Sequence, residues 1–255
     1  MINEVLRGLS EAQTQLLYNI FNMLFWVVFS IALLIYINRE QKLSKIKIAL
    51  VLVIPYAVDL IIVGVAGIIK TLTASVVFFP TYYPVYFVPI MLATSAVISF
   101  VIKMDLAKVM DKFILAFFLA RPCHCLACLC YGCCHGVIVD WGLYSCAEDA
   151  NVIPLRFFEI IFVLAFWVIN RRLYVNQKFK YRGQCAAQGT IEFGVMMVMF
   201  DRLCTTPSKF FLSLSMVGIT AWLTVVAGLI MLHVFSKEKQ PPAKIKHNQT
   251  KKRRK

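Results

Sequence analysis

Charged residues are scarce in this chain. Asp, Glu, Lys and Arg make up 16% of its 255 residues, and Asp and Glu together number 13. Soluble globular domains usually have about 25% charged residues and less than about 50% apolar ones, whereas this chain is 60% hydrophobic. The composition therefore excludes an ordinary soluble domain and predicts a membrane protein.

Several sequence motifs of common enzymes are also missing. The chain has no glycine-rich nucleotide-binding loop, no HExxH and no GxSxG. Nothing in the sequence therefore supports ATP hydrolysis, zincin proteolysis or serine hydrolysis. The apolar runs are hydrophobic on every side and lack the alternation of membrane β-strands, which favours helices.

What the chain does have is a series of long apolar runs. A membrane-spanning helix needs about 20 apolar residues to cross a hydrocarbon core about 30 Å thick. We predict an all-α, polytopic membrane protein of about seven transmembrane helices, built as one domain (1–236) with a basic, disordered tail (237–255). We expect the first run to remain as a span and not to be cleaved as a signal peptide. The predicted spans are 17–37, 48–69, 85–102, 113–132, 157–170, 184–200 and 210–235.

The distribution of basic residues predicts the orientation of these spans. With the amino terminus outside, 21 of the 27 Lys and Arg residues fall in cytoplasmic segments and five fall outside, as the positive-inside rule requires. The carboxyl terminus is then cytoplasmic, and the net charge of +14 reflects this rule and not nucleic-acid binding. We expect the terminal KKRRK to lie on anionic lipid headgroups, which attract each basic residue by about 1 kcal/mol.

Charged side chains at membrane depth are costly and usually functional. Several of these charged side chains are predicted to lie in the outer leaflet, at the same depth as the glycines of residues 132–136. Together they predict a site that faces the outside. The alternative is an ion pair between Glu159 and an arginine that only holds helices together. The charged residues within predicted spans are Asp59, Arg121, Glu159 and Glu192, and those near the outer ends of spans are Arg156, Asp201 and Arg202.

The densest local feature is the segment 121–136, RPCHCLACLCYGCCHG, with six cysteines and two histidines. On a continuous helix, Arg121, His124, Cys128 and His135 would share one face within about 60°. This face is a candidate reactive or metal-ligating stripe, because His124 and Cys128 have a spacing that allows chelation. Alternatively, the cysteines serve as small residues that let helices pack closely.

Three segments together resemble a known family, the prolipoprotein diacylglyceryl transferases, and in particular divergent relatives with a GCC-aromatic-G signature. Residues 131–136 (YGCCHG) resemble the family's GCCxG element, and 154–159 (PLRFFE) resemble its P-x-Q-x-x-E with Arg in place of Gln. Residues 200–202 (FDR) resemble the acidic-plus-arginine end of the penultimate helix. The resemblance covers about 115–203. The family's HGG-type motif and its catalytic asparagine have no counterpart here.

The resemblance implies a reaction and a set of site residues. Family members move a diacylglyceryl group from phosphatidylglycerol to the cysteine thiol of a lipoprotein signal peptide. Arginines would hold the phosphate leaving group, a glutamate would orient an arginine or take the thiol proton, and a histidine would serve as a base. The implied catalytic residues are Arg121, His135, Glu159 and Arg202, and the implied substrate-binding residues are Gly132, Gly136, Arg156 and Asp201.

The sequence thus predicts a membrane-embedded transferase that acts on phospholipid in a bacterial-type plasma membrane. Its predicted partners are the membrane, a phosphatidylglycerol-like lipid and a lipoprotein signal peptide, with no cofactor, no metal and no nucleic acid. Two alternatives remain open. One is an inactive scaffold or a transport or accessory protein. The other is a thiol-redox or metal-handling protein built on the Cys/His stripe, in which Cys146 and Cys204 of the outer loops could form a disulfide.

Overall fold

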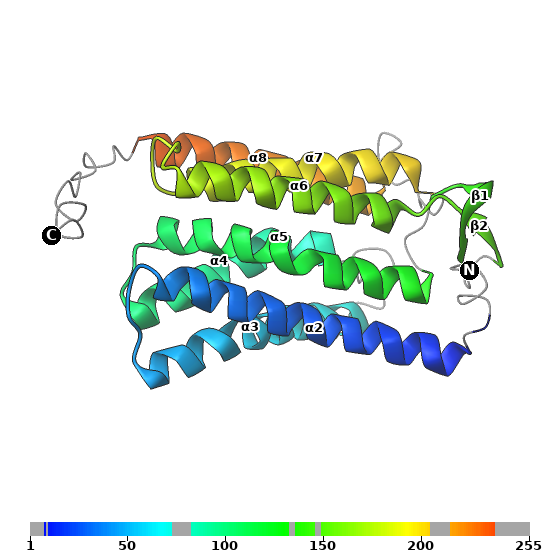
Figure 1. Ribbon diagram of the computed structural model, residues 1–255, viewed down its shortest axis with the longest axis horizontal. Coiled ribbons are helices and arrows are strands. Elements are labelled where there is room, and N and C mark those ends of the chain that lie inside the picture. The colour runs from blue at the N-terminus through cyan, green and yellow to red at the C-terminus, as the bar shows by residue number, and fades with distance from the viewer. Residues whose placement is uncertain are drawn as a thin grey trace, which may run out of the picture.

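The computed structural model describes residues 10–72, 83–132, 136–145, 149–204 and 215–237, together with Gly8. These residues are mostly helical, as predicted, and Figure 1 shows long helices lying side by side. The helices are α2 (Glu11–Asn38), α3 (Lys45–Leu72), α4 (Tyr83–Ile102), α5 (Leu106–Tyr131), α6 (Leu155–Val175), α7 (Gln184–Leu203) and α8 (Met216–Ser236).

The prediction of an all-α chain missed one element. An antiparallel ribbon of β1 (Ile138–Ser145) and β2 (Ala150–Val152) lies between α5 and α6. Residues 138–145, IVDWGLYS, are too few and too polar to cross a membrane, and β-branched and aromatic residues favour extended backbone. The ribbon therefore forms in what was expected to be an outer loop.

Each predicted span falls on one of the seven described helices, although the bounds differ. α6 continues to Val175, beyond the predicted end at residue 170, because Arg171 and Arg172 extend into the exposed region at its end. α5 starts at Leu106, where the Asp105 side chain accepts a hydrogen bond from the Lys108 amide and caps the helix.

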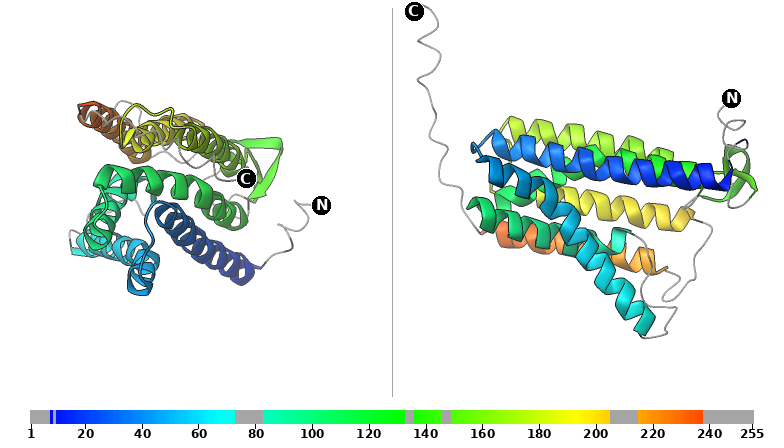
Figure 2. Two further views of the ribbon diagram at one scale, coloured as in Figure 1. Left: turned by 60° about the vertical axis from the view of Figure 1, so that its left-hand side comes forward. Right: turned by 90° about the horizontal axis from the view of Figure 1, so that it is seen from below.

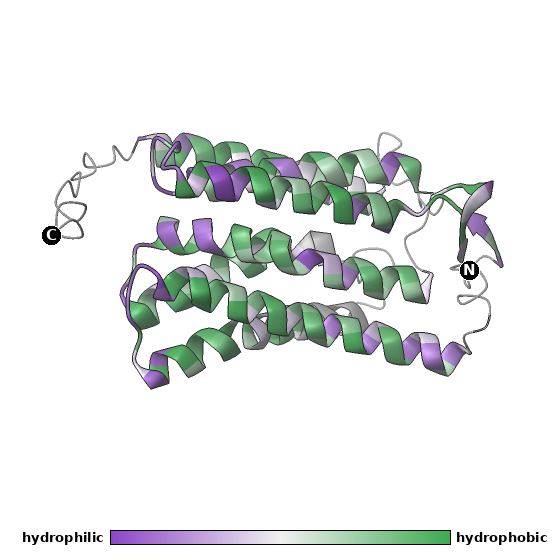
Figure 3. Cartoon of the chain, viewed as in Figure 1, coloured by the Kyte–Doolittle hydropathy of each residue, from purple (hydrophilic) through white to green (hydrophobic). Residues whose placement is uncertain are grey.

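Length and composition identify the helices that could cross a membrane. Four described helices are long and apolar enough, and Tyr86–Ile102 is a shorter apolar helix. Figure 3 shows hydrophobic residues along the middle of the bundle and hydrophilic residues towards its ends. The four helices are Glu11–Asn38, Lys45–Val65, Leu106–Tyr131 and Val217–Ser236.

The bundle has two chemically different ends (Figure 1). The α2–α3, α4–α5 and α6–α7 connections lie at one end with the last turn of α8. We call this the basic end, because its connections contain residues such as Arg39, Lys103 and Lys180. The ribbon and the start of α2 lie at the other end, which we call the hairpin end.

α5 is the central helix of the bundle. It contacts α2, α4, α6 and α7, and it is the most buried of the four candidate spans. Phe117 packs against Phe87 and Phe193, with ring centroids 4.6 Å and 5.1 Å away. α3, which contains Pro55, is the most exposed candidate span and crosses the bundle obliquely (Figure 2).

α7 and α8 approach closely through glycines. A Cβ atom added to Gly194 would lie 2.9 Å from the backbone nitrogen of Val225, and one added to Gly228 would lie 3.0 Å from that of Ile191. Small residues at helix interfaces allow this close approach in membrane proteins. The absence of a side chain at these two positions therefore sets the distance between the two helices.

Charged residues connect helices at the basic end. The buried carboxylate of Asp111 on α5 accepts hydrogen bonds from the backbone amides of Gly183 (2.9 Å) and Ala186 (2.8 Å) at the start of α7. These amides are among those that a helix start leaves without partners in its own helix. A side chain of α5 thus caps α7 and fixes the end of one helix to the other.

Glu40, in the turn after α2, joins the same end of the bundle. Its carboxylate lies 3.0 Å from the ammonium of Lys112 and accepts a hydrogen bond from the Tyr174 hydroxyl at 2.9 Å. Burial alone would raise the pKa of Glu40, but the attraction of Lys112 outweighs burial, so this pKa lies below its ordinary value. Glu40 therefore stays ionised near neutral pH and ties α2 to α5 and α6.

Candidate functional site

The candidate site lies at the hairpin end, where three helices come together. α5 is followed by Gly132, which adopts a left-handed conformation (φ 77°) and whose carbonyl accepts a hydrogen bond from the Ser145 hydroxyl at 3.0 Å. Glycine adopts this conformation without strain and commonly follows the last turn of a helix. The turn redirects the chain into the ribbon, which then covers the end of α5.

Gly136 pairs with two segments that are distant from it in the sequence. Its amide donates to the Ile153 carbonyl at 2.9 Å, and it pairs with Cys204 in an isolated antiparallel bridge. It thereby brings the segment after α5 beside the segments before α6 and after α7. A Cβ atom on Gly136 would lie 2.8 Å from the Cβ of Ile153, so the close pairing needs glycine. The resemblance singled out Gly136 as a substrate-binding residue. The structure gives a steric reason for glycine at this position.

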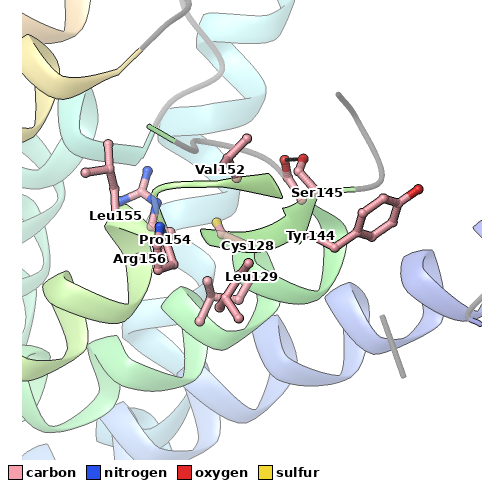
Figure 4. Close-up of a pocket in the computed structure, with 10 residues that line it drawn as sticks. Cys128, Leu129, Tyr144, Ser145, Val152, Pro154, Leu155 and Arg156 are labelled. Atoms are coloured by element: carbon pink, nitrogen blue, oxygen red, sulfur yellow. Dashed lines mark hydrogen bonds between the residues drawn. The ribbon is translucent and has the colours of Figure 1, made fainter. Parts of the chain in front are cut away.

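A small pocket that is partly open to solvent lies under the ribbon; the empty space in it, open solvent included, is about 300 Å³. We call it the hairpin pocket. Figure 4 shows residues from the end of α5, the ribbon and the start of α6 arranged around it. Most of its walls are apolar, and Arg156 is the one charged residue among those that line it. The lining residues are Cys128, Leu129, Gly132, Leu143, Tyr144, Ser145, Val152, Pro154, Leu155 and Arg156.

Three of the predicted site residues meet beside this pocket. Arg121 Nε lies 2.7 Å from Glu159 Oε1, and Arg156 Nη1 forms an ion pair with Glu159 Oε2. Arg121 and Glu159 are fully buried, and Arg156 is 8% exposed. We call these three side chains the arginine–glutamate group. Two guanidinium groups share one carboxylate, so the group carries a net charge of +1.

The surroundings of Arg121 are largely aromatic. Its guanidinium carbon lies 6.0 Å from the centroid of the Phe117 ring and 5.7 Å from that of Phe193. Such contacts stabilise a cation that has left water. Arg121 is therefore the deep member of the group, whereas Arg156 reaches the hairpin pocket.

Two other predicted site residues, Asp201 and Arg202, are not among those that line the pocket. Arg202 is exposed at the end of α7, and the half-buried Asp201 accepts a hydrogen bond from the Ser215 hydroxyl. Their substrate-related roles stay predictions. His135 and the neighbouring Cys133 and Cys134 lie outside the described residues.

The Cys/His stripe is shorter than a continuous helix over 121–136 would make it. α5 ends at Tyr131, so Arg121, His124 and Cys128 share its helix, whereas His135 lies outside the described residues. Within the part of the chain that the structure describes, no three His, Cys, Asp or Glu side chains are placed to hold a metal ion. Cys204 is a thiol, and its expected disulfide partner Cys146 lies outside the described residues.

The two remaining membrane-depth carboxylates are separate from the pocket. Glu192 accepts hydrogen bonds from Asn170 at 2.5 Å and Gln188 at 2.8 Å, between α6 and α7. Asp59 lies on α3, and its Oδ1 atom is buried with no hydrogen-bond partner among the described residues. Neither carboxylate lies beside an arginine in the described contacts, so neither resembles the arginine–glutamate group.

Comparison with known proteins adds no assignment: no family model and no curated protein matches this chain. The resemblance to the diacylglyceryl transferases therefore stays a prediction. Its support is the residues of 131–136, 154–159 and 200–202, together with the meeting of Arg121, Arg156 and Glu159 in space.

Proposed function

We propose that the chain crosses a bacterial-type plasma membrane seven times, with its amino terminus outside and its carboxyl terminus in the cytoplasm. Two observations support this topology. The described residues form seven helices, one on each predicted span, and the connections rich in Lys and Arg gather at one end of the bundle (Figure 1). With the basic end in the cytoplasm, the hairpin pocket faces the outside.

We propose that the protein is a transferase that acts on phospholipid, similar to the enzymes that move a diacylglyceryl group to a cysteine thiol. The observation that carries this proposal is the buried arginine–glutamate group, with its net positive charge, beside an outward pocket with apolar walls. Guanidinium groups match the geometry of phosphate oxygens, and apolar walls suit the glyceryl and acyl parts of a lipid. The acceptor would be the cysteine of a lipoprotein signal peptide.

The geometry assigns a different role to each member of the group. Arg156 lines the pocket and is placed to contact a lipid phosphate. In the reaction, the thiol sulfur forms a bond to the glyceryl carbon while the bond from that carbon to the phosphate oxygen breaks, and glycerol phosphate leaves with the thiol proton on a phosphate oxygen. A fixed positive charge stabilises the negative charge that develops on this leaving group. Because both Glu159 oxygens contact guanidinium groups, Glu159 suits orienting the arginines better than taking a proton.

The test is transfer from labelled phosphatidylglycerol to a cysteine-containing signal peptide in purified membranes. We expect label on the peptide with the wild-type chain and at least a tenfold lower rate with Arg156→Gln, since hydrogen bonds to charged groups contribute about 1.5–3 kcal/mol. Arg171→Gln is the matched control: Arg171 lies on the same helix, is exposed, and stacks 5.1 Å from the Trp167 ring.

The outcomes separate the alternatives. Transfer that Arg156→Gln reduces and Arg171→Gln preserves would support the transferase. A folded wild-type protein that transfers nothing would reject this reaction and favour the inactive scaffold. Equal loss in both variants would show that general positive charge, and not the hairpin pocket, supports the activity.

A further inference from the structure

A second set of polar side chains includes Cys128, which lines the hairpin pocket. His124 Nε2 lies 3.8 Å from Cys128 Sγ, one turn further along the helix. The other ring nitrogen, Nδ1, lies 2.7 Å from the side-chain oxygen of Asn22 on α2. A thiol, an imidazole and an amide thus follow one another in a chain of contacts across two helices.

The tautomer of the imidazole follows from these contacts. An amide oxygen accepts hydrogen bonds and does not donate them, so Nδ1 carries the ring proton and donates it to Asn22. Nε2 then presents its lone pair towards the Cys128 thiol. This is the arrangement of an activated nucleophile: a base within reach of the nucleophile, oriented by a third group, with a distance that is often longer in the absence of substrate.

The thiol is also placed where a substrate could meet it. Cys128 is 3% exposed, and it is one of the residues that line the hairpin pocket (Figure 4). Leu129, Leu143 and Val152 line the same pocket, and Arg156 lies at the start of α6 on its border. The pocket therefore brings apolar side chains, a cation and a thiol together at one place.

We propose that Cys128 is the nucleophile of an acyl-transfer centre that takes a fatty acyl group from an ester of a phospholipid. His124 acts as the general base, and Asn22 is a positioning residue that fixes the orientation of the imidazole. The inference rests on the proposed function for the identity of the lipid donor. It adds a covalent acyl-enzyme, which transfer of a diacylglyceryl group to a signal peptide does not need.

The step balances without any oxidant or reductant. His124 Nε2 takes the thiol proton while Cys128 Sγ bonds to the ester carbonyl carbon. The carbon–oxygen ester bond then breaks, and His124 returns the proton to the departing lysophospholipid hydroxyl. In the second half, an acceptor amine or hydroxyl attacks the thioester carbon and gives its proton to His124. The carbon–sulfur bond breaks, and His124 passes the proton to the Cys128 sulfur, which is a thiol again.

A structural role is the competing explanation for the His124–Asn22 contact, which also ties α2 to α5. His124 packs against Phe25, with ring centroids 6.1 Å apart. A tie between helices would not need a thiol next to the second nitrogen, nor a pocket that opens on that thiol. The two explanations also predict different chemical reactivity, which an experiment can measure.

The experiment uses the purified full-length chain and p-nitrophenyl decanoate, an activated ester with no phosphate. We expect the mass of one decanoyl group on Cys128, removable by hydroxylamine as a thioester is. Cys123 and Cys130 are half-buried thiols on the same helix that do not line the pocket, and we expect them to react at least tenfold more slowly. Cys123→Ser and Cys130→Ser should leave the modification unchanged.

Variants of the base, His124, and of the positioning residue, Asn22, should change the acylation rate in different ways. General base catalysis contributes about 10²- to 10⁴-fold, so His124→Gln should lower the acylation rate at least 100-fold. Asn22→Asp keeps an acceptor and should retain most of the rate, whereas Asn22→Leu should lower it. Equal acylation of Cys123, Cys128 and Cys130, or a rate that His124→Gln leaves unchanged, would overturn the inference.

The same samples distinguish this inference from the proposed function. Arg171→Gln, at an exposed residue of α6 that does not line the pocket, should not affect acylation by the phosphate-free ester. Normal diacylglyceryl transfer without acylation of Cys128 would overturn the inference alone. Acylation of Cys128 without diacylglyceryl transfer would overturn the proposed function alone. Peptide mass mapping of the wild-type chain locates the acylated cysteine, so the test does not depend on whether the variant Cys128→Ser folds.

Discussion

Single residues carry the chemistry of this protein, and the most informative of them is Glu159. It is fully buried between Arg121 and Arg156, in a region with few other polar groups. Moving charges out of water costs several kcal/mol for each ion, and this cost is recovered only with good partners. The burial of two guanidinium groups against Glu159, one of them lining the hairpin pocket, favours a site for an anion over helix packing alone.

Neutralising Glu159 should destabilise the protein strongly. Glu159→Gln keeps the shape of the side chain but removes the described carboxylate that pairs with both buried guanidinium groups, and breaking such a contact costs about 3–5 kcal/mol. Equilibrium unfolding in detergent micelles would measure this loss. The double variant Arg121→Met/Glu159→Gln should recover part of the stability, because it also removes the deeper of the two cations.

Glu192→Gln is the matched control for that measurement. Glu192 is a half-buried carboxylate of the neighbouring helix, and its described partners are the amides of Asn170 and Gln188. Its neutralisation leaves no cation uncompensated and should cost less. Equal stability of Glu159→Gln and the wild-type chain would show that the arginines do not depend on this carboxylate.

For single residues, the sequence reveals which charged side chains lie in or near apolar runs. It does not reveal which of these side chains contact one another in the fold. Arg121, Arg156 and Glu159 stand out because a charge near an apolar run is costly. The sharing of one carboxylate by two arginines depends on how α5 packs against α6. Asn22 carries no such signal: it lies 102 residues from His124, and an amide near the start of an apolar helix is unremarkable until the fold brings the two together.

Among the elements, the helices were predictable and the ribbon was not. Long apolar runs select helices because helices satisfy their own backbone hydrogen bonds in lipid. Helix ends depend on contacts from elsewhere, such as the capping of α7 by Asp111. The ribbon depends on the turn at Gly132 and on the pairing of Gly136 with Ile153, neither of which hydrophobicity indicates.

The contact between α7 and α8 gives an element-scale prediction. Gly194→Ala would place a Cβ atom 2.9 Å from the Val225 nitrogen and 3.0 Å from the Ala221 oxygen, so the helices would have to separate. Overpacking of this kind typically costs about 1–3 kcal/mol. Gly64→Ala is the control, because its Cβ would meet nothing within 4 Å, and alanine favours helix over glycine by about 1 kcal/mol. Equal unfolding midpoints for the two variants would contradict the close packing of α7 and α8.

The two ends of the whole molecule contain different sets of charged side chains. The basic end holds the ion pair of Glu40 and Lys112 and the capping carboxylate of Asp111. The hairpin end holds the pocket and the arginine–glutamate group. In the proposed orientation, a lipid of the outer leaflet could reach the pocket, while the positive charge of the opposite end would face the cytoplasmic headgroups. The charge pattern of the sequence predicts this polarity, but only the fold shows that the pocket and the buried arginines share one end.

The most direct test of the central claim is whether the hairpin pocket holds an anionic phospholipid. Native mass spectrometry of the purified protein, with equal amounts of phosphatidylglycerol and phosphatidylethanolamine supplied, would measure which lipid stays bound. We predict preferential retention of phosphatidylglycerol by the wild-type chain and by Arg171→Gln, and loss of that preference in Arg156→Gln. Retention of the same lipid by Arg156→Gln as by the wild-type chain would contradict a phospholipid site at the arginine–glutamate group.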